Sequence, residues 1–189
     1  MSEQAIMQTR AEIRTGTSLS AEMFRALPES NQIIEHVDGV VIVSPSPTIL
    51  HQRLVLRTYD LLRQIAPSGE VFTAPLDVYL GDDTVQPDVF WVAEGSACHP
   101  TDNDRFAGPP ELIVEVLSTS EGRDRVIKFD LYEQHGVQEY WLLGADYVEV
   151  YELQQAQLRR MGAFLAGQSF NSPVLGTTIH TDRIFLSAS

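Results

Sequence analysis

The amino-acid sequence predicts a mixed α/β domain whose sheet is flanked by two main helices. Two segments carry apolar residues at helical spacing, and several short apolar runs between turn residues are typical of strands. These elements follow one another as helix, hairpin, helix, three strands, helix and further strands, an order that favours an α/β class. The length of 189 residues and a hydrophobic content of 43% fit one compact domain with its own core.

The N-terminal region predicts an arm and a short helix. Residues 1–17 are polar and lack a hydrophobic period, so we expect a flexible N-terminal arm before a single domain over residues 18–189. Ser18 or Ser20 supplies an N-cap for a short helix that ends near Leu27.

A hairpin and the first long helix follow. Asp38 and Gly39 stand between two apolar runs, and both residues tolerate the positive φ of a two-residue hairpin turn. Pro47 and Thr48 then open a helix that extends to about Ile65. One stripe of this helix is predicted to face the core: Leu50, Leu54, Thr58, Leu61 and Ile65.

The middle of the chain predicts three strands and the second long helix. Residues 71–80, 85–92 and 111–117 are strand-like, and a polar loop rich in Gly, Pro, Asp and Asn separates the last two. Residues 123–135 form a predicted helix, and Gly136 stands where a left-handed C-terminal cap belongs.

The last third of the chain predicts further strands. Residues 139–143 and 148–153 are strand-like, and the second is expected to pair with residues 157–164. Residues 172–185 are expected to add a short edge element.

Charge and composition exclude several classes of protein. The chain has 13 basic and 26 acidic residues and a formal net charge of −13, which opposes nonspecific attraction to nucleic acids and anionic membranes. No apolar run has the length of a signal peptide or a membrane span. The single cysteine, Cys98, has no intramolecular partner for a disulfide. We therefore expect a cytoplasmic protein that does not interact with membranes.

Three carboxylates stand in segments that are otherwise apolar. Glu115 lies in the middle of ELIVEVLS, Asp88 precedes the apolar run VFWV, and Glu35 alternates with Ile33 and Val37. Burying an unpaired carboxylate costs several kcal/mol, so each needs a cation or hydrogen-bond donors. A structural ion pair explains any one of them. The three together indicate a functional site.

The use of basic residues adds a fourth candidate. Lys128 is the only lysine among the 13 basic residues, which suggests a site that needs a compact ammonium group rather than a planar guanidinium. Asp124, Lys128 and Tyr132 recur every four residues and share one face of the predicted helix. A solvated lysine on an amphipathic helix is the alternative interpretation.

This set of side chains suits metal-dependent phosphodiester hydrolysis. Carboxylate oxygens are the ligands that Mg²⁺ prefers, and the ion retains several of its waters. The metal lowers the pKa of a bound water and stabilises charge in the transition state, while a nearby ammonium orients the water or the phosphate.

The ordered motifs resemble a known nuclease superfamily. Gln86-Pro87-Asp88 followed by Glu115 is similar to the PD-(D/E)xK pattern, and within that superfamily the chain most resembles the Uma-type restriction-endonuclease-like family, long known as a domain of unknown function. The resemblance extends from about residue 18 to residue 185. It rests on IIEHVDGVVIVSPSP followed by HQR, then PDVFWV, ELIVEVLSTS and GVQEYWLL.

The resemblance implies a restriction-endonuclease-like fold and a role for each candidate residue. It implies that Asp88 and Glu115 bind Mg²⁺, or Mn²⁺, and that Glu35 is a supporting acid. The superfamily usually places its lysine two residues after the second acid, where this chain has Leu117. The catalytic lysine of this family pattern is then Lys128. The implied activity is endonucleolytic cleavage of DNA, and by analogy with restriction enzymes a homodimer is expected.

The net charge leaves two further functions open. A DNA substrate requires a local basic surface, for which Arg53, Arg57, Arg123 and Arg125 are the candidates. His51 begins the first long helix and could approach a phosphate, but we expect it to face solvent. The alternatives to a nuclease are a non-catalytic interaction or regulatory protein that keeps the fold, and a hydrolase of a small phosphorylated substrate.

Overall fold

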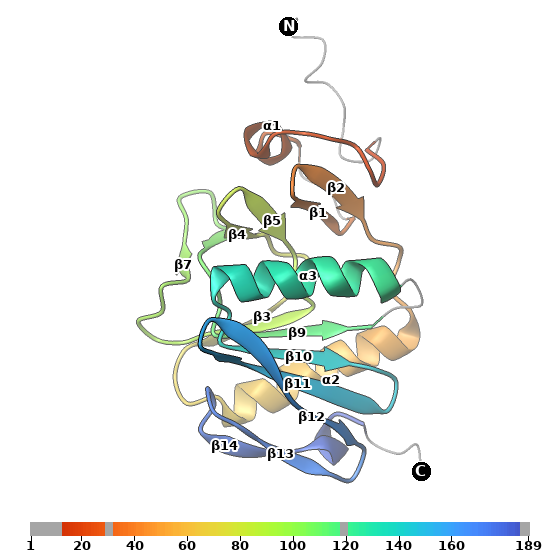
Figure 1. Cartoon of the computed structure of the whole chain (residues 1–189), viewed down its shortest axis with the longest axis vertical. Coiled ribbons are helices and arrows are strands. Elements are labelled where there is room, and N and C mark those ends of the chain that lie inside the picture. Colours follow the sequence, from red (N-terminus) through yellow and green to blue (C-terminus); the bar gives the residue numbers. More distant parts are fainter. Residues whose placement is uncertain (1–12, 29–31, 118–120, 186–189) are drawn as a thin grey trace, which may run out of the picture.

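The structure is a computed structural model that describes residues 13–28, 32–117 and 121–185, without the side chains of residues 121–125 (Figure 1). It contains a central six-stranded sheet with the strand order β12-β11-β10-β9-β6-β3. Strands β9 and β10 are parallel, and the other neighbouring pairs of this sheet are antiparallel. The strands are β3 (Glu70–Thr73), β6 (Val89–Val92), β9 (Leu112–Val116), β10 (Glu139–Leu143), β11 (Tyr147–Gln154) and β12 (Gln157–Leu165).

A second six-stranded sheet, with the order β2-β1-β5-β4-β8-β7, and a two-stranded sheet complete the β-structure. The strands of the second sheet are β1 (Ile34–Val37), β2 (Val40–Val43), β4 (Val78–Leu80), β5 (Asp83–Val85), β7 (His99–Pro100) and β8 (Phe106–Ala107). The small sheet consists of β13 (Ser169–Ser172) and β14 (Thr177–His180).

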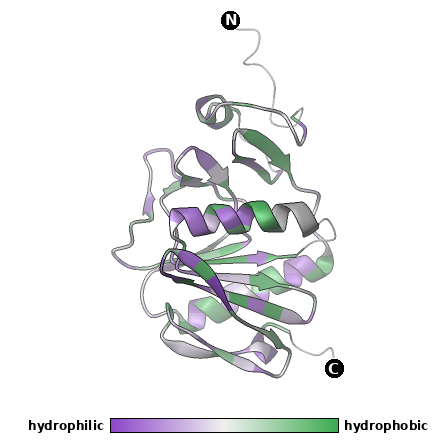
Figure 2. Ribbon diagram, in the orientation of Figure 1, coloured by the Kyte–Doolittle hydropathy of each residue, from purple (hydrophilic) through white to green (hydrophobic). Residues whose placement is uncertain are grey.

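Two long helices cover opposite faces of the central sheet. The helices are α1 (Ala21–Arg25), α2 (Ile49–Ile65), α3 (Glu121–His135) and the 3₁₀ helix η3 (Thr181–Arg183). Along β9, Leu112 and Val114 pack in the core that contains α2, whereas Ile113 packs in the core that contains Leu131 of α3. Side chains alternate along a strand, so Glu115 lies on the α3 face. Both long helices combine hydrophilic and hydrophobic residues, as amphipathic helices do (Figure 2). The predicted mixed α/β class with two main helices is confirmed.

Several local predictions are also confirmed. Asp38 and Gly39 have φ values of 50° and 75° at the turn of the β1–β2 hairpin, and the side chain of Ser20 caps α1. Thr48 caps α2, and its hydroxyl accepts a hydrogen bond of 3.2 Å from the backbone N–H of His51. The predicted stripe of α2 is wrong at Leu50, which is 47% exposed, because the buried face is turned toward Val55 and Leu62.

Two of the strand predictions are wrong. Residues 71–80 form β3 and β4, and residues 85–92 contribute to β5 and β6, so each predicted strand is divided between the two large sheets. Pro75 and Pro87 have no N–H for a sheet ladder, and the chain leaves one sheet for the other around each of them. Asp88 lies at the second of these transitions, directly before β6.

The described part of the predicted N-terminal arm lies along β2. Gly16 donates a backbone hydrogen bond to Val41, and Val41 donates one to Thr17. Ile13 is buried beside them. Residues 1–12 of the predicted arm lie outside the described residues. In the described part of the chain, no helix has the length and hydropathy needed to cross a membrane.

A buried carboxylate joins the small sheet to the central sheet. Glu139 accepts hydrogen bonds from Trp141 Nε1 at 2.5 Å, Ser172 Oγ at 2.9 Å and the backbone N–H of Val174 at 3.3 Å. Its side chain is fully buried, and this burial raises its pKa above the ordinary value despite the three donors. Each donor satisfies part of the polarity of the carboxylate, so Glu139 connects β10 to the segment around β13.

Glu139→Ala is therefore expected to lower the free energy of unfolding by about 3 kcal/mol, because it leaves buried donors without an acceptor. Chemical denaturation measures this change. The control is Glu94→Ala, at an exposed position, which is expected to alter the stability by less than about 0.5 kcal/mol. Equal effects of the two substitutions would contradict the assigned role of Glu139.

Candidate active site

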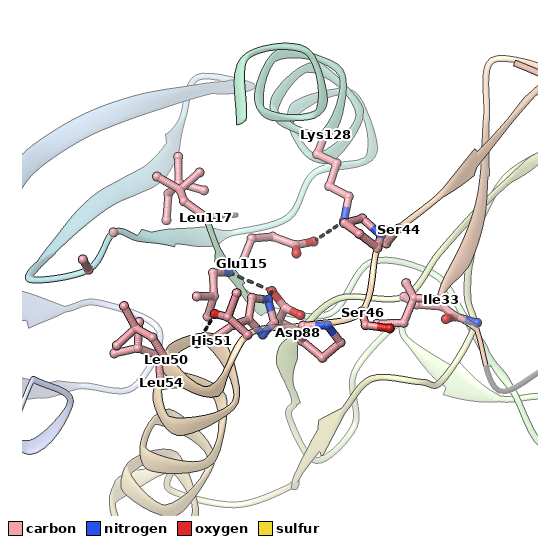
Figure 3. Close-up of a pocket in the computed structure, with 18 of the residues that line it drawn as sticks. Ile33, Ser44, Ser46, Leu50, His51, Leu54, Asp88, Glu115, Leu117 and Lys128 are labelled. Atoms are coloured by element: carbon pink, nitrogen blue, oxygen red, sulfur yellow. Dashed lines mark hydrogen bonds and ion pairs between the residues drawn. The ribbon is translucent and has the colours of Figure 1, made fainter. Parts of the chain in front are cut away.

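The four candidate residues from the sequence line one cavity of about 410 Å³ (Figure 3). It lies at the edge of the central sheet where β9 and β10 end, beside the first turn of α2. Such carboxyl ends of parallel strands are common positions for ligand sites. Its polar lining residues include Glu35, His51, Gln86, Asp88, Glu115 and Lys128.

Lys128 of α3 connects two of the carboxylates. Its Nζ lies 3.0 Å from Glu35 Oε1 in β1 and 3.0 Å from Glu115 Oε1 in β9. Tyr132, one turn further along α3, donates a 2.6 Å hydrogen bond to the same oxygen of Glu115. The face shared by Lys128 and Tyr132 is thus directed at Glu115. The side chain of Asp124, predicted to share this face, lies outside the described residues.

The charges in this cluster shift one another's pKa values. Burial is the largest effect on Glu115 and raises its pKa to about 7, assisted by Asp88 and Glu35 and opposed by Lys128 and the Tyr132 hydrogen bond. Burial also disfavours the ammonium of Lys128. The negative charges of Glu115, Glu35 and Asp88 outweigh that effect and hold the pKa of Lys128 well above its ordinary value. Lys128 is therefore a permanent cation at neutral pH.

Asp88 is fixed from two sides. Its Oδ2 accepts a 2.8 Å hydrogen bond from the backbone N–H of Val116, the residue after Glu115, and lies 3.1 Å from Nε2 of His51. The hydrogen bond to Asp88 raises the pKa of His51 above its ordinary value, although burial opposes the shift. The protonated imidazole is thus favoured beside Asp88. These contacts place Asp88 next to the end of β9, on the same cavity as Glu115.

The prediction that His51 faces solvent is wrong, because its side chain is only 14% exposed and contacts Asp88. A histidine at the start of a helix carries no local signal of burial, since its partner belongs to a distant segment. The one relevant signal was its position in HQR, within the motifs that carry the family resemblance.

A second row of polar side chains supports the site. Glu35 Oε1 accepts a 2.8 Å hydrogen bond from the backbone N–H of Gln86. The side-chain amide of Gln86 donates to Asp77 Oδ1 at 2.5 Å, and Arg105 lies 3.5 Å from the other oxygen of Asp77. Asp77 thereby fixes the orientation of Gln86, and the backbone of Gln86 fixes Glu35.

The residues present fit a divalent cation. The three carboxylates Glu35, Asp88 and Glu115 outnumber the two cationic groups that contact them, Lys128 and the protonated imidazole of His51. When the carboxylates are ionised, the cluster therefore has an excess of negative charge. Asp88 Oδ1 and Glu115 Oε2 have no hydrogen-bond partner among the described residues, and these hard oxygens suit Mg²⁺ with its retained waters. Within the described ranges, no three His, Cys, Asp or Glu side chains converge as a complete metal-binding group. Water and substrate would then complete the coordination.

The arginines expected to form a basic rim are not part of the described cavity lining. Arg53 is exposed on α2, and Arg57 donates a hydrogen bond of 3.4 Å to the backbone oxygen of Ile184. The side chains of Arg123 and Arg125 lie outside the described residues. The basic residues in the described lining are His51 and Lys128. Of the two, Lys128 keeps its positive charge at every pH near neutrality.

The raised pKa of Glu115 predicts a pH-dependent stability. The folded protein binds this proton more tightly than the unfolded chain, for which the ordinary value is 4.5. The resulting stabilisation is complete below pH 4.5 and is lost as the pH rises through about 7. In EDTA, Glu115→Gln is therefore expected to gain on the order of 1–3 kcal/mol relative to wild type between pH 5 and 8. Thermal unfolding across this range measures it, with Glu94→Gln as the control. A pH-independent difference would contradict the shift.

Comparison with known proteins places the chain in a family. A family model named Uma2 and described as "Putative restriction endonuclease" matches residues 21–182. A solved structure from Anabaena variabilis ATCC 29413, described as a putative nuclease belonging to DUF820, has the same fold with a TM-score of 0.73 and 20% sequence identity, over 88% of this chain and 97% of that chain. Comparison with curated proteins gives no match. The family model covers most of the sequence, which confirms the resemblance, and the chain belongs to the Uma2 family.

Proposed function

We propose that this protein is a divalent-metal-dependent nuclease that hydrolyses phosphodiester bonds in DNA. The observation that carries the proposal is the convergence of Asp88, Glu115 and Lys128 on one cavity, from three separate segments of the chain. Membership in the Uma2 family and the fold shared with the Anabaena structure agree with nuclease chemistry.

Asp88 and Glu115 are the residues that would hold Mg²⁺ or Mn²⁺. Asp88 Oδ1 and Glu115 Oε2 are the oxygens available, since Oδ2 and Oε1 accept hydrogen bonds from the protein. When bound, the metal supplies an acidified water and stabilises negative charge on the phosphate.

The side chains around the two ligands orient them and the substrate. Tyr132 and Lys128 hold Glu115 Oε1, and Val116 and His51 hold Asp88 Oδ2, so neither carboxylate is free to rotate away. The ammonium of Lys128 donates a hydrogen bond to the phosphate or to the attacking water. Its positive charge stabilises the negative charge that develops on the phosphate in the transition state. Glu35 keeps this ammonium in place.

One observation favours a second substrate class. The formal charge of −13 and the lack of described arginines in the cavity lining weaken attraction to a polyanion. A small phosphorylated molecule depends less on such attraction. The homodimer inferred by analogy, the cytoplasmic location and the non-catalytic alternative stay predictions.

Purified protein incubated with plasmid and with single-stranded DNA is expected to cleave in Mg²⁺ or Mn²⁺ and not in EDTA. Asp88→Asn, Glu115→Gln and Lys128→Met are each expected to reduce the rate at least about 100-fold, since each removes a ligand or the cation. Glu94→Gln is the matched control and keeps full activity. Cleavage that persists in Glu115→Gln would exclude the assigned metal site. A metal-induced rise in melting temperature without cleavage of DNA would favour the small-substrate alternative.

His51→Ala is expected to lower kcat by about 10- to 100-fold in a variant that remains folded, because Asp88 loses one of the two groups that orient it. Steady-state kinetics measures the loss. His99→Ala, at an exposed loop position, is the control and is expected to match wild type. Equal kinetics for the two variants would contradict a positioning role for His51.

A further inference from the structure

A second cavity, of about 640 Å³, adjoins the candidate active site. We call it the side cavity and call the first the catalytic cavity. The lining residues that both cavities share are Ile33, residues 44–47, His51 and Asp88. The proposed metal ligand Asp88 therefore lies at the boundary between the two cavities, and a molecule bound at Asp88 can extend into either.

The two cavities differ in charge. Both cavities are lined by the ionisable residues His51 and Asp88. The catalytic cavity also contains Glu35, Glu115 and Lys128. Apart from His51 and Asp88, the described lining of the side cavity contains no ionisable side chain. Instead it combines amide, hydroxyl and apolar groups, among them Gln32, Gln52, Val55, Leu56, Thr73 and Pro75.

This lining suits an uncharged planar heterocycle. Aliphatic side chains such as Val55 and Leu56 offer surfaces for the faces of a ring, and a few polar groups fix its orientation, as in most small-molecule sites. The side-chain amide of Gln52, exposed on α2, offers both a donor and an acceptor, which matches the edges of nucleobases. A phosphate in the side cavity would meet no permanent cation among the described lining residues.

The depth of the site restricts which nucleic acid can reach it. Asp88 and Glu115 are only 8% and 7% exposed, and Glu35 is 1% exposed. A base-paired strand is held in a stiff helix, whereas an unpaired nucleotide can turn out of the strand and enter a cavity. The formal net charge of −13 also disfavours attraction to the dense negative charge of a duplex.

We propose that the side cavity binds the base of an unpaired nucleotide whose phosphate lies at Asp88 and Glu115, so that single-stranded or locally unpaired DNA is the preferred substrate. This inference rests on the proposed nuclease function and names its substrate class. The ionic groups of the catalytic cavity contact the phosphate, and the neutral groups of the side cavity contact the adjacent nucleoside.

The test fills the side cavity without changing the catalytic residues. Leu56 is 57% exposed, so Leu56→Trp is expected to fold normally and to occupy part of the space available for the base. Leu165→Trp is the matched control, because Leu165 is 54% exposed on β12 and belongs to neither described lining. Circular dichroism and melting temperature verify that both variants are folded.

Cleavage is measured on one labelled oligonucleotide presented as a single strand, as a perfect duplex and as a duplex with an unpaired bulge. Wild type is expected to cut the single strand and the bulge at least about 10-fold faster than the duplex, the scale of one lost base contact. Leu56→Trp is expected to raise the KM for the single strand about 10-fold or more, and Leu165→Trp is expected to match wild type. Duplex cleavage as fast as single-strand cleavage, or equal behaviour of the two tryptophan variants, overturns the inference.

Binding separates this inference from the proposed function. Fluorescence anisotropy with Glu115→Gln reports the affinity for the same single strand and duplex without requiring turnover. If no DNA is cleaved by wild type, the nuclease proposal fails. Single-strand binding that is about 10-fold tighter than duplex binding and is weakened by Leu56→Trp still supports the side cavity as a base site. Equal or absent binding of the two DNA forms overturns it.

Discussion

The contact of the Lys128 ammonium with Glu35 and Glu115 is the interaction on which the site depends. It connects three units of the fold, since Lys128 belongs to α3, Glu35 to the second sheet and Glu115 to the central sheet. Buried charges of this kind are tolerated only when their partners remain in place, because removal of one partner leaves an uncompensated charge in a medium of low dielectric. The same contact that positions the cation therefore also fixes how α3 and the two sheets meet.

Much of the fold could be predicted because its signals are local. Asp38 and Gly39 specify a turn by their own tolerance of positive φ, and Thr48 specifies the start of α2 through its own hydroxyl. The breaks at Pro75 and Pro87 are visible in the sequence, but the assignment of the resulting strands to two different sheets could not be predicted in this way. Apolar periodicity shows that a segment is a strand, but the sheet that it joins is decided by partners far away in the sequence.

The site was partly predictable for a related reason. Glu115 and Asp88 stand out because a carboxylate among buried apolar residues is costly, and Lys128 stands out because it is the only lysine. Burial cost is a property of a residue and its sequence neighbours. The contact between His51 and Asp88 arises only when α2 meets the residue before β6, and the side cavity also needs the loop before α2 and the end of β3. The sequence contains no comparable signal for either.

The short segment from Gln86 to Asp88 is one of the crossings between the two large sheets, and its length limits which insertions the site can accept. The backbone of Gln86 holds Glu35 in one sheet, and two residues later Asp88 is held by Val116 in the other. The length of this segment therefore sets the distance between Glu35 and Asp88 across the junction of the two sheets. One inserted residue here would leave the strand pairing within each sheet intact but would displace Glu35 relative to Asp88. The exposed turn at Gln155 and Ala156, between β11 and β12, lies outside the cavity lining and can vary in length without moving either acid. Tolerance of insertions should therefore be much lower at residues 86–88 than at this hairpin turn.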